Sequence, residues 1–187
     1  FLYLVYLTYK NQQQLAREKA RFETLFTSIG DAVIACDERS IVTYANPHAL
    51  RMAQSDERDF VGKNYGEVLT VVRDEGEIID IKDRPYYRAL QSGKTYEASI
   101  HDHFNILRKD GTKLPITVTD SPIVVNGKVV GVIIVLRDSS KEKEIDLMKT
   151  EFISFASHQL KTPLTVVNWN LEMLLSGDFG VLTQNQK

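Results

Sequence analysis

The sequence predicts an α+β protein in which a mixed domain lies between two long helices. Three observations predict this arrangement. Apolar residues recur at helical spacing over residues 11–29 and again over residues 145–169. Between these segments, β-branched and aromatic runs alternate with turn residues, which is typical of antiparallel strands. The same middle region holds short helical stretches interrupted by glycine, so we expect helices beside a sheet.

Composition limits what the 187-residue chain can be. The length allows one domain and part of another, and a hydrophobic content of 43% suffices for a packed core. The chain has 23 basic and 25 acidic residues and no basic block, so we expect no binding to nucleic acid. Its single cysteine, Cys36, excludes an internal disulfide and leaves the redox compartment open.

The first ten residues, Phe1 to Lys10, are apolar and aromatic but fall well short of the roughly 20 residues that span a bilayer. Their tyrosines and Lys10 are typical of the interfacial end of a membrane helix that begins upstream. The alternative is the start of a cytosolic coiled coil. A secretory signal peptide is not expected, because a basic leader and a small-residue cleavage site are missing.

A connector helix is predicted next, over residues 11–29. Leu15, Phe22 and Ile29 recur at sevens with polar residues on the other faces, so this helix is expected to pair in a dimer. Gly30 should end it.

The middle region begins with a predicted hairpin, in which strands Ala32–Cys36 and Ile41–Ala45 flank the turn 37–40. Residues 46–69 should form short helical pieces broken by Gly62 and Gly66, and Asp83–Gln91 should form another helix. The remaining predicted elements are three longer strands, Tyr96–Leu107, Lys113–Val125 and Val129–Leu136, joined by turns at 108–111 and at Asn126-Gly127. The last strand is apolar nearly throughout, which predicts burial on both faces.

This order of elements resembles a PAS domain over about residues 22–138. The matching residues are Asp37, Ile41 to Asn46, Gly62-Lys63, Ala89-Leu90, Gly93-Lys94, Arg108 to Gly111, Ser121 to Ile123, and Gly127 to Asp138. The resemblance implies a five-stranded antiparallel sheet with short flanking helices, often enclosing a small ligand whose identity stays open. It also implies a signalling hinge of the Asp-x-Thr type at Asp138-Ser139-Ser140, where Asp138 and the hydroxyl of Ser140 match and the middle residue is polar instead of apolar. Asp138 should cap the outgoing helix and pair with nearby arginines.

These residues do not match the cofactor-binding sites known in the PAS family. Cys36 falls in a strand, which argues against covalent flavin photochemistry, and the helix Asp83–Gln91 has no histidine to ligate haem. His101 and His103 lie two apart in a predicted strand, so their rings would share a face and could start a metal site. Two imidazoles are too few for a metal centre, and we expect none.

The C-terminal helix carries the most specific motif. Its repeating apolar residues, which predict pairing with other helices, are Ile145, Met148, Phe152, Phe155, Val166 and Trp169. His158 lies beside this frame, where solvent can reach it. Together with Phe152-Ile153-Ser154, the run from Ser157 to Leu164 resembles the H-box of sensor histidine kinases. The resemblance implies that His158 accepts the γ-phosphoryl group of ATP, a role that suits an imidazole because it is largely neutral and nucleophilic near neutral pH.

Three neighbours of His158 carry further expectations from the resemblance. Gln159 occupies the usual acidic position, where it can orient the ring but cannot accept a proton. Thr162 matches a position linked to dephosphorylation of the partner. Pro163 removes a backbone hydrogen bond and should kink the helix just beyond the histidine.

The family further implies a homodimer, a response-regulator partner, and ATP with Mg²⁺ bound to a catalytic domain whose asparagine- and glycine-rich boxes do not occur in these 187 residues. The expected parts are a juxtamembrane or coiled-coil helix (1–21), a PAS sensor domain (22–138), and the first helix with the hairpin start of a dimerisation and phosphoacceptor (HisKA) domain (139–187). A second helix should begin at Thr183. We expect the cytoplasmic portion of a membrane-attached sensor histidine kinase in a two-component system. The alternative is a non-catalytic PAS ligand-binding and dimerisation module of a degenerate kinase.

Overall fold

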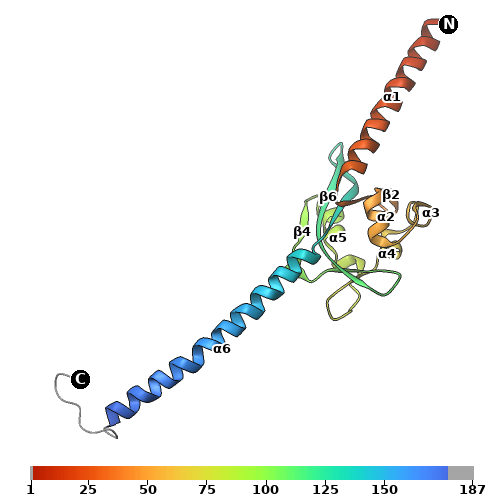
Figure 1. The fold of residues 1–187 in the computed structure, drawn as a ribbon. Helices are drawn as coiled ribbons and strands as arrows, with labels where there is room; N and C mark the ends of the chain where they lie inside the picture. Colours follow the sequence, from red (N-terminus) through yellow and green to blue (C-terminus); the bar gives the residue numbers. More distant parts are fainter. Residues whose placement is uncertain (1, 177–187) are drawn as a thin grey trace. The chain divides into compact units, whose positions relative to one another are not determined.

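The computed structural model describes residues 2–176, and an antiparallel sheet with short helices beside it occupies the middle of the chain (Figure 1). The strands are β1 (Ala32–Asp37), β2 (Val42–Ala45), β3 (Val71–Val72), β4 (Tyr96–Ala98), β5 (Asn105–Leu107), β6 (Lys113–Val125) and β7 (Lys128–Asp138). The strand order is β2-β1-β7-β6-β5-β3, and β4 also pairs with β6. The predicted α+β class and antiparallel sheet are confirmed.

Long helices stand before and after the sheet in the sequence. The helices are α1 (Leu2–Ser28), α2 (Pro47–Ala53), α3 (Glu57–Phe60), α4 (Tyr65–Val68), α5 (Pro85–Ser92), α6 (Ser140–Ser176) and the 3₁₀ turns η1 (Ile81–Asp83) and η2 (Ile100–Asp102). By their internal contacts, residues 1–141 and 142–187 form two separate units. Over residues 2–176, no helix has an apolar stretch long enough to cross a membrane. The helix predicted from Thr183 lies outside the described residues.

The first hairpin forms as predicted. β1 pairs antiparallel with β2, and the turn between them is held by Asp37, whose Oδ1 accepts hydrogen bonds from the backbone N–H groups of Arg39 and Ile41, both at 2.9 Å. This is the usual way in which an aspartate organises a turn.

The helical segment after the hairpin is also confirmed, with one error. Gly62 separates α3 from α4 and adopts a φ of 81°, which few other residues tolerate. Gly66 does not break the chain, because it lies inside α4, where its N–H donates to Oδ1 of Asn64 at 2.9 Å. Further on, α5 begins at Pro85 and ends at Ser92, and Gly93 follows directly. A proline at the start and a glycine just after the end are typical of a helix.

The predicted strand Tyr96–Leu107 is wrong, because it divides into β4, η2 and β5. Ser99 and Asp102 form a capping box that starts the 3₁₀ turn, and His103 ends that turn with a φ of 57°. Local side-chain bonds thus compete with the strand here. Together with the two-residue β3, this division gives the sheet seven segments instead of five.

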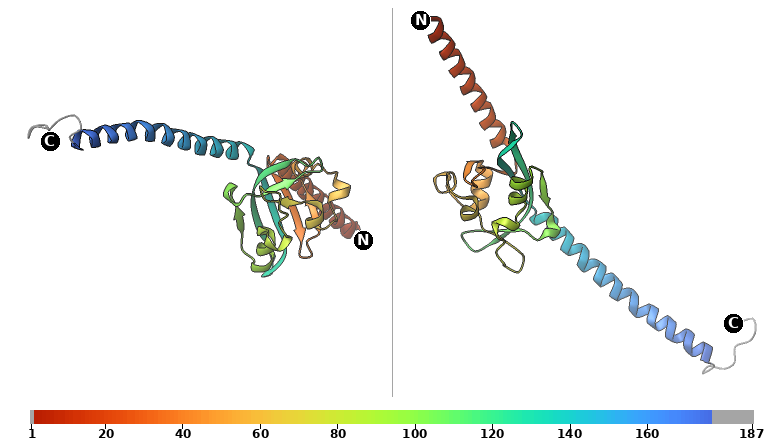
Figure 2. Two further views of the ribbon diagram at one scale, coloured as in Figure 1. Left: turned by 90° about the horizontal axis from the view of Figure 1, so that it is seen from below. Right: turned by 180° about the vertical axis from the view of Figure 1, so that it is seen from behind.

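The core lies on one face of the sheet. In β7 the side chains of Val132, Ile134 and Leu136 are buried, whereas Ile133 and Val135 on the other face are half-buried. Burial on both faces was therefore predicted wrongly. The core cluster combines the buried strand residues with side chains from α2 to α5, the short helices gathered beside the curved sheet (Figure 2).

Candidate functional site

The predicted hinge lies where β7 ends and α6 begins. Oδ1 of Asp138 accepts a hydrogen bond from the backbone N–H of Ser140 at 2.9 Å, so the carboxylate satisfies a free N–H at the start of α6. The next residue back, Ser139, donates its own N–H to the carbonyl of Pro115 at 3.0 Å. Two hydrogen bonds therefore fix the exit from the sheet.

The expected pairing of Asp138 with an arginine is wrong. Within residues 2–176, no arginine lies at ion-pair distance from Asp138. The neighbouring Arg137 instead pairs with Asp31, with Nη2 3.0 Å from Oδ2 and Nε 3.2 Å from Oδ1. This two-point contact links the end of β7 to the residue just before β1.

Ser139 introduces an unusual feature at the hinge. Its side chain is 1% exposed, and its hydroxyl has no hydrogen-bond partner among the described residues. A buried hydroxyl without a partner destabilises the folded state. The resemblance had placed an apolar side chain at this position, and the burial of Ser139 gives the reason for that preference.

α6 carries the apolar frame on its surface. Its frame residues have exposed fractions between 55% and 69%, namely Ile145, Met148, Phe152, Phe155, Val166 and Trp169. Among residues 2–176 no side chains cover this face, which is unusual for so many large apolar side chains.

The H-box residues lie on the same continuous helix. His158, Gln159 and Thr162 are exposed, and the helix continues through Pro163 to Ser176 without a break. The hydroxyl of Thr162 lies 3.4 Å from the carbonyl oxygen of His158, one turn back. The imidazole of His158 is thus open to solvent on a helix.

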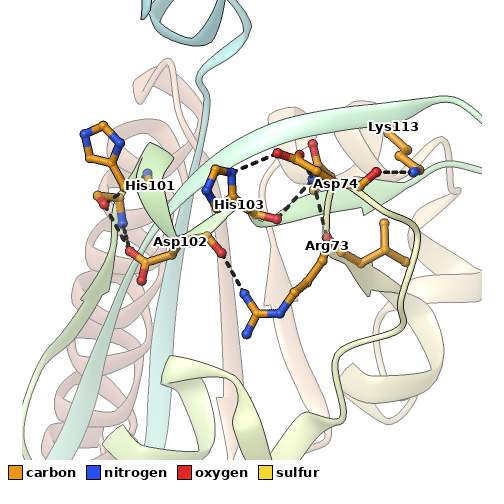
Figure 3. A network of polar contacts seen from close by, with 9 residues as sticks. Arg73, Asp74, His101, Asp102, His103 and Lys113 are labelled. Atoms are coloured by element: carbon orange, nitrogen blue, oxygen red, sulfur yellow. Dashed lines mark hydrogen bonds and ion pairs between the residues drawn. The ribbon is translucent and has the colours of Figure 1, made fainter.

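His101 and His103 do not share a strand face. His101 lies in η2, whereas His103 ends that turn and places Nδ1 2.8 Å from Oδ2 of Asp74 (Figure 3). The same carboxylate accepts a hydrogen bond from Asn105, and the carbonyl of Asp74 accepts one from Lys113. This network ties the loop after β3 to β5 and β6. Over the described residues, no three His, Cys, Asp or Glu side chains are grouped to hold a metal ion.

Sequence reasoning missed a polar group in the core. Asp120 on β6 is 1% exposed, and one of its carboxylate oxygens has no partner among the described residues. Burial raises the pKa of Asp120 well above its usual range, against the opposing effects of a backbone hydrogen bond from Tyr86 and the charge of Arg84. The signal was present in the sequence: Leu114, Ile116 and Val118 alternate inward along β6, and Asp120 takes the next inward position.

Arg84 is the buried cation of the same core. It donates hydrogen bonds to the carbonyls of Leu69 at 2.9 Å and Ile79 at 3.2 Å, and its guanidinium lies 5.6 Å from the ring centre of Tyr65. Nearby, burial raises the pKa of the Cys36 thiol, with smaller contributions from Asp120 and Asp37. A buried thiol with a raised pKa is poorly reactive.

A family model for the PAS domain matches residues 30–141, and the chain belongs to the PAS domain family. Two of the solved structures that share this fold illustrate the similarity. One is the PAS domain of an HTR-like protein from Haloarcula marismortui, with 17% identity, a TM-score of 0.52, and coverage of 69% of this chain and 98% of that one. The other is an RNA-binding light-oxygen-voltage receptor, with 19% identity, a TM-score of 0.58, and coverage of 78% and 39%.

Among proteins of curated function, the chain is similar to the sensor protein kinase WalK of Staphylococcus aureus. The two are 29% identical over 167 residues, which cover 89% of this chain and 36% of the relative. For WalK of strain JH9, an alignment of the same length and identity covers 25% of the relative. The chain thus spans about a quarter to a third of the length of these relatives. The chain therefore contains a PAS domain and is similar to part of a sensor protein kinase.

Proposed function

We propose that this chain is the sensory and phosphoacceptor portion of a two-component sensor histidine kinase, with His158 as the phosphoacceptor. The observation that carries the proposal is the H-box sequence around His158, on an exposed helix that follows a PAS domain. The similarity to WalK extends over 89% of the chain and supports it.

The proposed reaction is phosphoryl transfer to the imidazole. A ring nitrogen of His158 attacks the γ-phosphorus of ATP, the bond to the bridging oxygen breaks, and ADP leaves. The proton on the other ring nitrogen passes to water, because Gln159 has no site to accept it. ATP and Mg²⁺ bind to a catalytic domain outside these residues, and the phosphoryl group then moves to an aspartate of a response regulator.

The exposed apolar frame of α6 supports a homodimer. Phe152, Phe155 and Trp169 are each more than 60% exposed, and pairing with a second copy of the helix would remove them from water. A PAS domain that alters the packing of this pair would open or close access to His158. The hinge Asp138-Ser139-Ser140 is the connection through which it would act.

A second function is favoured by Gln159. A kinase that has lost the acidic residue beside its histidine would leave a PAS module that binds ligand and assembles dimers without catalysis. The two functions differ in one property, because only the first incorporates phosphate.

The test uses the complete protein with radiolabelled ATP. The proposal predicts acid-labile incorporation that is abolished by His158→Gln and retained by His101→Gln, which removes an exposed histidine from η2. A Gln159→Glu variant should restore an acidic partner and increase the rate. Persistent labelling of His158→Gln would reject the assignment. If the natural protein is not labelled and the Gln159→Glu variant is, the result would favour the degenerate module.

Membrane attachment is part of the proposal. Tyr6 and Tyr9 on α1 are about 60% exposed, and they precede Lys10, as at the end of a membrane helix. Fractionation of the complete protein tests this attachment: recovery with membranes is expected, and recovery in the soluble fraction would contradict it.

A further inference from the structure

A polar cleft of about 420 Å³ opens on the PAS domain beside the hinge. Its charged lining consists of Arg51, Arg108, Arg137, Asp31 and Asp138. These residues come from α2, from the turn after β5, from the end of β7 and from the residue before β1. The cleft is within the usual size range of small-molecule sites.

Arg108 is held in place on the wall of this cleft. Its Nε donates a hydrogen bond to the carbonyl of Met52 at 3.3 Å, and the side chain is half-buried. Its two terminal nitrogens make no hydrogen bond within residues 2–176. A guanidinium fixed through Nε presents its remaining N–H groups as a fork, which suits a carboxylate or a phosphate.

The charged residues of the cleft give it a net positive charge. Arg137 and Asp31 neutralise each other through their two-point contact. Over the described part of the chain, neither Arg51 nor Arg108 has a carboxylate at ion-pair distance. Asp138 also lines the cleft, so its three arginines and two aspartates leave a net charge of one positive unit. A concave surface with a net positive charge attracts an anion.

The rest of the lining consists of Gly30, His48 and two apolar residues, Met52 and Leu114. An inorganic ion would leave this part unfilled, whereas a short hydrocarbon body would cover it.

We propose that this cleft binds a small organic anion, with its carboxylate or phosphate held by Arg108 and Arg51 and its hydrocarbon part against Met52 and Leu114. Binding requires only the PAS domain, so it stands independently of phosphoryl transfer to His158. Because Asp138 lines the cleft and also accepts the hydrogen bond from Ser140, an anion bound there lies next to the hinge carboxylate.

The test is calorimetric titration of the whole chain at constant ionic strength with succinate, glycerol 3-phosphate and inorganic phosphate. Saturable binding of one of the organic anions is expected. Arg108→Gln and Arg51→Gln should each weaken it by about tenfold or more, the loss expected for a charge-assisted contact. Arg58→Gln, which removes an exposed arginine of α3 outside the cleft, should leave the affinity unchanged.

Each alternative result overturns the proposal. Lack of saturable binding of all three probes would do so, as would equal affinity in the natural chain and both cleft variants. Binding of inorganic phosphate alone would reject the apolar part of the site. Because Arg108 also donates a hydrogen bond to the carbonyl of Met52, circular dichroism should verify that Arg108→Gln is folded. Arg51 is exposed on α2, so the Arg51→Gln variant tests the site without removing that hydrogen bond.

Discussion

Gly131 of β7 lies against the backbone of Cys36 in β1 with no room for a side chain between them. A Cβ on Gly131 would overlap the carbonyl oxygen of Cys36 and would also touch the backbone of Asp37. The pairing of β1 with β7 therefore depends on a glycine at this place.

Gly131→Ala should lower the free energy of unfolding by about 2 kcal/mol, because a clash with backbone atoms cannot be relieved by a change of rotamer. Urea denaturation measures the effect. Gly30→Ala is the control, since a Cβ there meets nothing within 4 Å and the backbone is not in the left-handed region. Equal stability of the two variants would contradict this account of the sheet.

Asn46 joins three segments through its buried side chain. Its Oδ1 accepts hydrogen bonds from the N–H groups of Val33 and Ala49, and its Nδ2 donates to the carbonyls of Phe26 and Asp31. Asn46→Ala should cost about 3 kcal/mol, because buried backbone groups lose their partners.

The matched control for Asn46 is Asn64→Ala, which removes one capping bond from α4 and should cost about 1 kcal/mol. Thermal denaturation of both variants compares them. A loss for Asn46→Ala no larger than for Asn64→Ala would show that the four bonds do not hold the segments together.

The raised pKa of Asp120 predicts a pH dependence of stability. Since the folded state favours the protonated carboxyl, the contribution of Asp120 to stability is greatest at acidic pH. It falls as the pH rises from the unfolded pKa of 3.8 through the higher folded pKa. Asp120→Asn should remove this fall and make stability less dependent on pH. The urea midpoints of both proteins across a pH series measure this dependence. An unchanged pH dependence in Asp120→Asn would contradict the raised pKa of Asp120.

The pKa of Asp110 is shifted in the opposite direction, so its effect on stability has the opposite dependence on pH. Hydrogen bonds from the side chain of Thr112, then from Gln54, lower its pKa to about 2. Its contribution is therefore present above pH 3.8 and is lost as the pH falls towards 2. Asp110→Asn should alter only this acidic range, which separates it from Asp120→Asn.

Removal of the unpaired hydroxyl at the hinge should stabilise the fold. Ser139→Ala is expected to raise the free energy of unfolding by about 1 kcal/mol, because the buried hydroxyl lacks a partner while the backbone bond to Pro115 remains. The exposed neighbour provides the control, since Ser140→Ala should change stability by less than about 0.5 kcal/mol. A destabilised Ser139→Ala would mean that the hydroxyl has a partner in solution.

Periodic patterns and turn residues predicted the fold well, since the first hairpin, α5 and the β6–β7 hairpin lie within a few residues of their expected positions. The strand Tyr96–Leu107 was wrong because Ser99 and Asp102 form a local capping box that no periodicity reveals. The same error placed His101 and His103 on one face.

Some relationships in the candidate sites depend on residues distant in sequence. The Arg137–Asp31 pair joins residues 106 positions apart, and no local pattern predicts it. The cleft beside the hinge likewise gathers arginines from three separate elements. By contrast, the H-box is contiguous in sequence, so His158 could be proposed before the structure was known.

The most direct test of the central claim is to locate the phosphoryl group on the complete protein after incubation with ATP and Mg²⁺. Mass spectrometry under neutral conditions should find it on the peptide that contains His158, and mild acid should remove it. Phosphate on another residue, or an acid-stable phosphate on a nearby serine or threonine with His158 unmodified, would contradict the account.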